Sequence, residues 1–136
     1  MSEQEIHDIC KKYNIKNYTI NSDGSIDVNG SVYLNDKNLT ELPLKFNKVG
    51  GDFDCSGNYI TSLLRCPKEV GGYFYCSGNF ITSLLRCPKE VGGYFYCYNI
   101  ELTTLKGYNG DYNKIRCYNK EKLIRKRRKF KIQNKV

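Results

Sequence analysis

Residues 49–69 read Val-Gly-Gly-Asp-Phe-Asp-Cys-Ser-Gly-Asn-Tyr-Ile-Thr-Ser-Leu-Leu-Arg-Cys-Pro-Lys-Glu, and residues 70–90 repeat them with three changes. Looser copies occupy residues 28–48 and 91–111, and a fifth copy, shorter by one residue, begins at Tyr112. A fixed period of 21 residues over most of the chain indicates a repeat protein, and the near-identity of the central pair indicates a recent duplication. The three changed positions are Asp52/Tyr73, Asp54/Tyr75 and Tyr59/Phe80.

Four positions of the repeat are apolar in every full copy. One turn of 21 residues cannot bury its own apolar face, whereas stacked turns hide these positions in a shared core. With 12 Gly, 12 Tyr and only three Pro, the chain favours many short strands joined by glycine turns and leaves little room for long helices. We therefore predict a β-rich solenoid of about 4.5 turns with short parallel strands. The four columns are Val32/Phe53/Phe74/Phe95, Leu34/Cys55/Cys76/Cys97, Leu39/Ile60/Ile81/Leu102 and Leu42/Leu63/Leu84/Leu105, and Ile115 and Cys117 continue the first two.

One copy, read as Phe74-x-Cys76-x-x-Asn79-x-Ile81-x-x-Leu84, resembles the leucine-rich repeat. It is similar to units of the form Gly-Gly-x-Phe-x-Cys-Ser-x-Asn-x-Leu-Thr-x-Leu-x-x-Cys-Pro in bacterial and tailed-phage proteins. The resemblance covers residues 28–119, and residues 18–28 and 34–43 also look like the first section of those phage proteins. It implies a leucine-rich-repeat fold and a phage or prophage protein that binds and modulates, for example inhibits, a host factor. The asparagine is present only at Asn58 and Asn79, so a two-rung asparagine ladder is expected.

The chain divides into three parts. Residues 1–27 are predicted to form an N-terminal cap, residues 28–119 the repeats, and residues 120–136 a basic C-terminal cap or tail. Ser2 is placed to cap a short helix over residues 3–13, with Glu5 completing a capping box. The segments 18–20 and 26–28, joined by Ser-Asp-Gly-Ser, predict a hairpin.

A row of polar and aromatic positions alternates with the core columns along the predicted strands. In a solenoid of this kind these positions line one concave face, which runs here from acidic residues to a tyrosine cluster. Tyrosine is enriched at interfaces, so the face predicts a protein-binding surface, although tyrosine also suits any exposed strand. The candidate partner-binding residues are Asp52, Asp54, Tyr73, Tyr75, Tyr94, Tyr96, Tyr98, Arg116 and Tyr118.

The basic tail is the second candidate site. Residues 120–136 contain nine Lys or Arg against one Glu, which equals the net charge of +8 of the whole chain. Such a cluster fits nucleic-acid phosphates or an acidic protein face. The alternative is that the segment binds nothing and is a solvated chain end, partly anchored by Leu123, Ile124, Phe130 and Ile132. The candidate cations for nucleic acid or an acidic partner are Lys122, Arg125, Lys126, Arg127, Arg128, Lys129 and Lys131.

The remaining residues favour a non-catalytic protein without metal or cofactor. The seven cysteines mostly follow the repeat and lack a close pair, so core packing is favoured over zinc or disulfides. His7, the only histidine, is expected at the surface, and no catalytic grouping or phosphate loop is evident. Leu64 and Leu85 are expected to fill the core, the alternative being a sticky surface or a dimer contact beside Arg65 and Arg86.

Location and partners follow from what the chain lacks. No segment resembles a secretion signal or a membrane span, so we expect a cytoplasmic protein, in the host cell if phage-encoded, without membrane contact. A protein is the favoured partner. A nucleic acid bound through the tail and a self-associating structural protein, for example a homodimer, are the alternatives.

Overall fold

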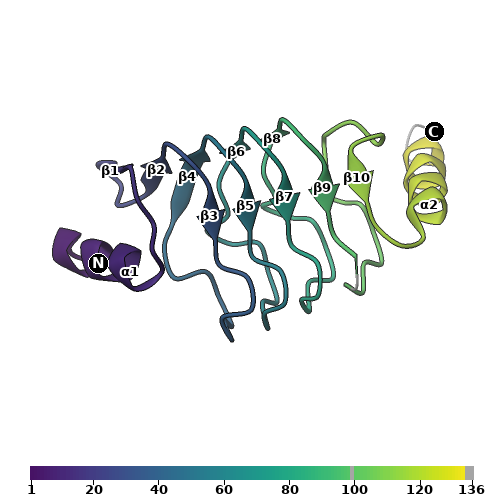
Figure 1. Ribbon diagram of the computed structural model, residues 1–136. Coiled ribbons are helices and arrows are strands. Elements are labelled where there is room, and N and C mark those ends of the chain that lie inside the picture. Colours follow the sequence, from purple (N-terminus) through teal and green to yellow (C-terminus); the bar gives the residue numbers. More distant parts are fainter. Residues whose placement is uncertain (99, 134–136) are drawn as a thin grey trace.

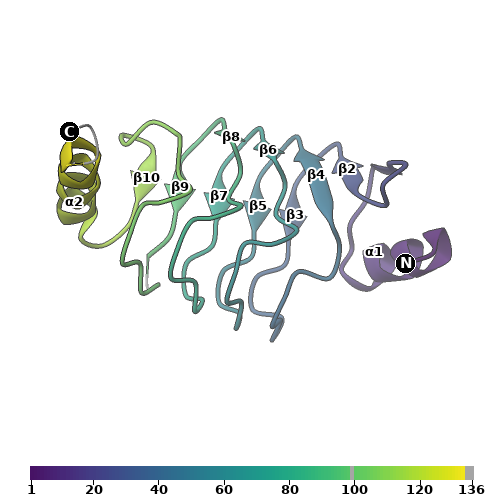
Figure 2. The ribbon, with the colours of Figure 1, turned by 180° about the vertical axis from the view of Figure 1, so that it is seen from behind.

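The computed structural model describes residues 1–98 and 100–133, without the side chains of Phe130, Ile132 and Gln133. It is a β-solenoid of about four turns with two helices, one at each end (Figure 1). Each central turn contributes one short strand to each of two sheets. One sheet lies toward the viewer in Figure 1 and the other in Figure 2, which shows the molecule from behind.

The first sheet contains the strands that the repeat predicts. In the first four copies, the residue before the strand and the second residue of the strand point outward, while the Val or Phe at the first position is buried. In the fifth copy, Ile115 takes the buried position. The strands are parallel and in register from turn to turn, with Phe53 beside Phe74 and Phe74 beside Phe95. In spatial order they are β10 (Ile115–Arg116), β9 (Phe95–Tyr96), β7 (Phe74–Tyr75), β5 (Phe53–Asp54) and β3 (Val32–Tyr33).

Beyond the predicted hairpin, the sequence analysis did not predict a second sheet, whose parallel strands in successive turns end at Val49, Val70 and Val91. Two adjacent glycines connect it to the first sheet in turns two to four, and neighbouring turns approach closely there. A Cβ atom added at Gly71 would lie 2.2 Å from the carbonyl oxygen of Gly50, so only glycine fits this corner. The strands, in spatial order, are β1 (Tyr18–Ile20), β2 (Ile26–Val28), β4 (Phe46–Val49), β6 (Glu69–Val70) and β8 (Glu90–Val91); β1 and β2 are antiparallel and the others parallel.

Between the two sheets runs a continuous core. Its spine is a file of aromatic rings, in which Phe53 and Phe74 stack with centroids 5.8 Å apart and Phe74 and Phe95 are separated by 4.8 Å. Phe46 and Tyr108 extend the file at its two ends. Because each ring contacts the ring of the next turn, the core is stabilised by neighbouring copies, as expected for a solenoid.

The asparagine ladder has the predicted two rungs. The side-chain amide of Asn79 is buried and donates to the carbonyl oxygens of Cys76, in its own turn, and of Cys55, in the preceding turn, at 3.1 and 2.9 Å. Its Oδ1 accepts from the Ile60 N–H at 3.0 Å. Asn58 repeats the arrangement one turn earlier. These neutral groups satisfy main-chain atoms that have no partner in either sheet.

At the N-terminal end lie helix α1 (Glu3–Lys12) and the β1–β2 hairpin, both as predicted from the sequence. The Ser2 hydroxyl accepts from the Glu5 N–H at 3.2 Å and so occupies the N-cap. Ile6 and Cys10 bury one face of the helix against the core, and the exposed His7 contacts the Tyr18 hydroxyl.

Two aspartates hold the hairpin to the first turn. Asp23 accepts from the hydroxyl and N–H of Ser25 and from Lys45, and these bonds keep the pKa of its carboxyl well below the ordinary value. For Asp27, burial raises the pKa, but bonds from the amides of Asn47 and Asn21 and from the Lys48 N–H outweigh it and leave the pKa lowered. Both carboxylates therefore stay ionised in the folded protein well below neutral pH.

At the C-terminal end, in the segment predicted as a basic cap or tail, residues 120–133 form the helix α2 (Lys120–Gln133) of 14 residues, for which the sequence analysis had predicted no conformation. Leu123 and Ile124 are buried against the last turn, which agrees with the anchoring alternative. The same role expected of Phe130 and Ile132 falls on side chains outside the described part. Within the described ranges, neither helix is long and apolar enough to cross a membrane.

The sequence analysis was wrong about Leu64 and Leu85, which do not fill the core. They are 49 % and 50 % exposed. Each occupies the second position of a turn closed by a main-chain bond, Cys66 N–H to the Leu63 carbonyl or Cys87 N–H to the Leu84 carbonyl. Residues at the corner of such a turn point away from the chain that the turn reverses, so the leucines face solvent.

Candidate partner-binding surface

Six tyrosines gather on the outward side of the first sheet, over strands β7, β9 and β10. We call this cluster the tyrosine face. It forms because successive side chains of a strand point to opposite sides, so the positions flanking the buried Phe column are all outward. The parallel register then places equivalent positions of neighbouring turns beside one another. Its members are Tyr73, Tyr75, Tyr94, Tyr96, Tyr98 and Tyr118.

The rings of the tyrosine face contact one another in ordered pairs. Tyr75 and Tyr96 stack almost parallel with centroids 5.0 Å apart, and Tyr73 and Tyr94 stack at 6.0 Å. The two stacks meet edge to face, with Tyr73 and Tyr75 separated by 6.1 Å. Because the rings hold each other in place, the face loses little side-chain freedom when a partner covers it.

The far end of the face carries a cation. The Arg116 guanidinium lies over the Tyr94 ring, with its central carbon 4.2 Å from the ring centroid. Beyond it, Tyr98 and Tyr118 pack with centroids 5.1 Å apart, and Tyr118 is 59 % exposed. The structure thus brings together all the aromatic and basic residues that the sequence assigned to this surface.

The acidic end of the face is partly occupied by main-chain contacts. Asp52 accepts from the Tyr73 N–H at 2.8 Å, and Asp54 accepts from the Ser56 N–H at 2.9 Å. Both aspartates lie on the predicted face and are half-buried, yet each commits a carboxylate oxygen to the backbone. They therefore shape the face as well as charging it.

Burial raises the pKa of the Tyr75 phenol above its ordinary value of about 10, and the nearby Asp52, Tyr96 and Tyr73 add to this effect. The phenol is consequently neutral at physiological pH. A tyrosine side chain offers apolar ring area together with a hydroxyl group that donates and accepts hydrogen bonds. This chemistry suits a protein surface of mixed polarity.

Tyr33 was missed by the sequence analysis. It is 56 % exposed on β3 and occupies the same column as Tyr75 and Tyr96, separated from them by Asp54. The signal was present, because the 21-residue register aligns position 33 with position 54. Tyr33 was overlooked because the first copy matches the others loosely around it.

The basic residues of α2 fall into two groups. Lys126 donates to the Thr103 carbonyl at 2.9 Å, and Arg127 donates to the carbonyls of Leu105 and Tyr108, so both are engaged with the last turn. The other predicted cations are exposed and have no hydrogen bond to a described residue; they are Lys122, Arg125, Arg128, Lys129 and Lys131.

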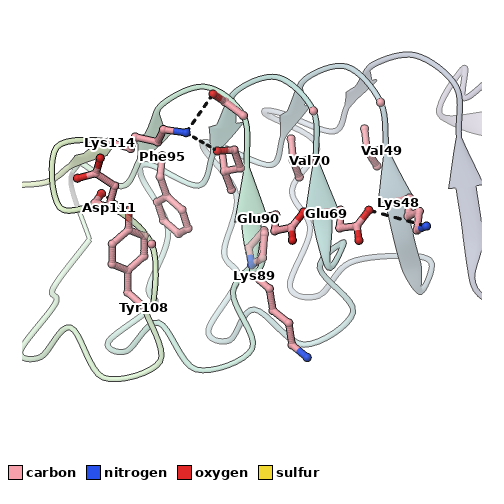
Figure 3. Close-up of a pocket in the computed structure, with 16 residues that line it drawn as sticks. Lys48, Val49, Glu69, Val70, Lys89, Glu90, Phe95, Tyr108, Asp111 and Lys114 are labelled. Atoms are coloured by element: carbon pink, nitrogen blue, oxygen red, sulfur yellow. Dashed lines mark hydrogen bonds and ion pairs between the residues drawn. The ribbon is translucent and has the colours of Figure 1, made fainter.

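A groove of about 620 Å³ opens beside β8, where the second sheet ends (Figure 3). The last copy is one residue short, and no strand pairs with the free edge of β8 in the described part of the chain. Lys114 reaches into this place and donates to the carbonyls of Val91 and Gly92 at 3.2 and 3.3 Å. Its ammonium group supplies the donors that a further strand would have provided.

The cysteines lie in or beside the core as free thiols. Burial raises the pKa of Cys55 to about 12 and that of Cys87 to about 11, so neither is a thiolate at neutral pH. In the described ranges, no three His, Cys, Asp or Glu side chains are grouped so as to hold a metal ion. No protein-family model, curated protein or solved structure matches the chain.

Proposed function

We propose that the chain is a non-catalytic protein-binding module of the leucine-rich-repeat type that grips its partner with the tyrosine face. The observation that supports this most is the continuous cluster of six mutually packed, partly exposed tyrosines. Tyrosines of this kind are enriched among the residues that carry most of the energy of protein interfaces. The proposal assigns no metal, cofactor or membrane contact.

The remaining parts of the chain support that surface. In this proposal residues 1–27 and 120–136 cap the two ends of the repeats, since open solenoid ends would otherwise pair with other chains. The Leu123 and Ile124 contacts support the C-terminal cap. The resemblance stated above adds that the protein is a phage or prophage product acting in the host cytoplasm, where binding modulates or inhibits a host factor.

The test is capture of a partner from a nuclease-treated bacterial lysate by the full chain, quantified by mass spectrometry. The variant Tyr75→Ala/Tyr96→Ala removes one stack and should reduce capture at least about tenfold, because interface aromatics contribute about 2 kcal/mol or more each. The matched control is Tyr59→Ala/Phe80→Ala, which removes another exposed stacked pair, with centroids 6.1 Å apart, outside the face.

Equal capture by both variants would contradict the proposal. Loss of capture after neutralising the exposed α2 cations, with the tyrosine variant unaffected, would favour the alternative site on α2. Light scattering on the purified chain would reveal the homodimer alternative as a doubled mass.

A further inference from the structure

A second groove has no residue in common with the tyrosine face. It lies between the turns at residues 63–66 and 84–87, which we call the corner turns, and the residues where strands β4, β6 and β8 begin. Its volume is about 570 Å³. Half of the residues around it are cations and none is acidic. We call it the cationic groove, and its basic residues are Lys45, Arg65, Lys68, Arg86 and Lys89.

Most of these cations are not neutralised by the protein. The ion pairs formed within the described residues are Lys45–Asp23 at 3.1 Å and Lys48–Glu69 at 3.9 Å. The other four groove cations are exposed, and Arg65 alone makes a side-chain hydrogen bond there, to the Leu42 carbonyl at 3.2 Å. Glu69 and Glu90 follow Lys68 and Lys89 in sequence and line the other groove, so the basic strip has an acidic border on one side.

The arginines occupy a position that the backbone reserves for glycine. Arg65 and Arg86 are the third residues of the corner turns and have φ of 74° and 67°. The equivalent residue of the fourth copy is Gly107, with φ of 98°. A non-glycine residue with this conformation is strained by about 1 kcal/mol or more, and such strain concentrates at functional positions. The arginines are therefore not explained by the turn itself.

The spacing of the cations repeats with the solenoid. Arg65 and Arg86 form one row and Lys68 and Lys89 a second, each with one cation per turn, and turns are spaced by about 4.8 Å along the axis. A nucleic-acid strand carries one phosphate about every 3.4 Å or more. Two parallel rows of cations suit such a regular line of negative charges.

The apolar part of the groove favours nucleic acid over an acidic peptide as the ligand. Leu64 lines the groove beside Arg65, and the buried Cys66 and Pro67 also line it. A single-stranded nucleotide presents a phosphate together with the exposed aromatic face of a base, whereas an aspartate or glutamate side chain presents a carboxylate on a short stem. The lining comes from three successive turns, roughly 10 Å along the axis, and a duplex would keep its bases stacked away from Leu64, whereas a single strand exposes them. We propose that the cationic groove binds single-stranded nucleic acid by its phosphates, independently of base sequence.

The experiment measures binding of a fluorescent thymidine strand of about 20 nucleotides to the full chain over a range of salt concentrations. Three variants each remove four positive charges. The groove variant is Arg65→Gln/Lys68→Gln/Arg86→Gln/Lys89→Gln, the helix variant is Lys122→Gln/Arg125→Gln/Arg128→Gln/Lys129→Gln, and the control is Lys11→Gln/Lys12→Gln/Lys16→Gln/Lys37→Gln. Circular dichroism confirms that each variant is folded. If the groove variant does not fold, Lys68→Gln/Lys89→Gln replaces it, because these lysines lie outside the two corner turns and, unlike Arg65, make no side-chain hydrogen bond within the described residues.

We expect the groove variant to lower the slope of log Kd against log salt by about 3, since each phosphate contact of a single strand contributes about 0.7. At about 50 mM salt its affinity should fall at least about 100-fold, while the control changes little. Equal losses in all three variants, or a loss in the helix variant alone, would overturn the proposal. Competition by polyglutamate as strong as by unlabelled thymidine strand would also overturn it, in favour of an acidic protein.

Discussion

The middle of the solenoid and its two ends satisfy their main-chain groups in different ways. In the middle, the neutral amides of Asn58 and Asn79 link neighbouring turns. At the front, the carboxylates of Asp23 and Asp27 accept main-chain N–H groups. At the back, cations donate to carbonyl oxygens of the last two turns; these cations are Lys114, Lys120, Lys126 and Arg127.

This difference follows from what each region borders. A central turn has a neighbour on both sides, so an amide that both donates and accepts is sufficient and is fully buried. At an end, one neighbour is missing, and the side chains that replace it remain in contact with water. Charged groups make the stronger hydrogen bonds there without a large desolvation penalty. Part of the basic character of residues 120–136 is therefore structural.

The largest effect is expected in the middle. Asn79→Ala leaves buried carbonyl and N–H groups of two turns without partners and should lower the free energy of unfolding by about 3 kcal/mol. Ile100→Ala, in the same column one turn later, should lower it by only about 1.5 kcal/mol, because Ile100 is half-buried and packs without ladder bonds among the described residues. Urea unfolding measures both. Equal losses would show that the column acts through packing alone.

An intermediate effect is expected at the back. Arg127→Met keeps the length of the side chain but removes the donors to the Leu105 and Tyr108 carbonyls, so the free energy of unfolding should fall by about 1 to 2 kcal/mol. Arg128→Met on the exposed side of the same helix is the control and should change it by less than about 0.5 kcal/mol. Urea unfolding measures both changes. Equal free energies of unfolding for the two variants would show that the contacts of Arg127 do not contribute to stability.

The smallest effect is expected at the front, and it depends on pH. Asp23 and Asp27 have lowered pKa values in the folded protein, so their stabilisation is present above the unfolded value of about 3.9 and is lost as the pH falls below it. The melting temperature, followed from pH 7 to pH 3, should drop less steeply in Asp23→Asn/Asp27→Asn than in the parent chain. Glu41→Gln/Glu101→Gln is the control. If its melting temperature also fell less steeply with pH than that of the parent chain, the acid sensitivity would not come from the hairpin aspartates in particular.

The sequence predicted those features that depend on the repeat alone. The buried Phe and Cys columns, the strands of the first sheet and the Asn79 ladder bonds recur with a fixed period and are visible without a structure. The tyrosine face was predictable for the same reason. Helix α1 followed from a local capping signal at Ser2.

The parallel pairing of the second sheet, helix α2 and the exposed leucines were not predictable in this way. Strands such as Glu69–Val70 are two residues long and show no alternation. Helix α2 has few apolar residues, and bonds such as that from Arg127 to the Leu105 carbonyl join it to a distant part of the chain. Leu64 faces solvent at the second position of a turn whose third residue, Arg65, has a positive φ, an unusual conformation for arginine.

The close match of residues 49–69 and 70–90 means that the number of turns can change without a change in the two ends. Both copies meet their neighbours through equivalent contacts, from the Phe53–Phe74 stack to the corner glycines. One more gene duplication of this unit would extend the rod while leaving both ends unaltered. A further copy of residues 70–90 would add two tyrosines to one side and another arginine and lysine to the other, whereas a copy of residues 49–69 would add two aspartates in place of the tyrosines. Evolution can thus adjust the reach of both surfaces together, without inventing a new fold.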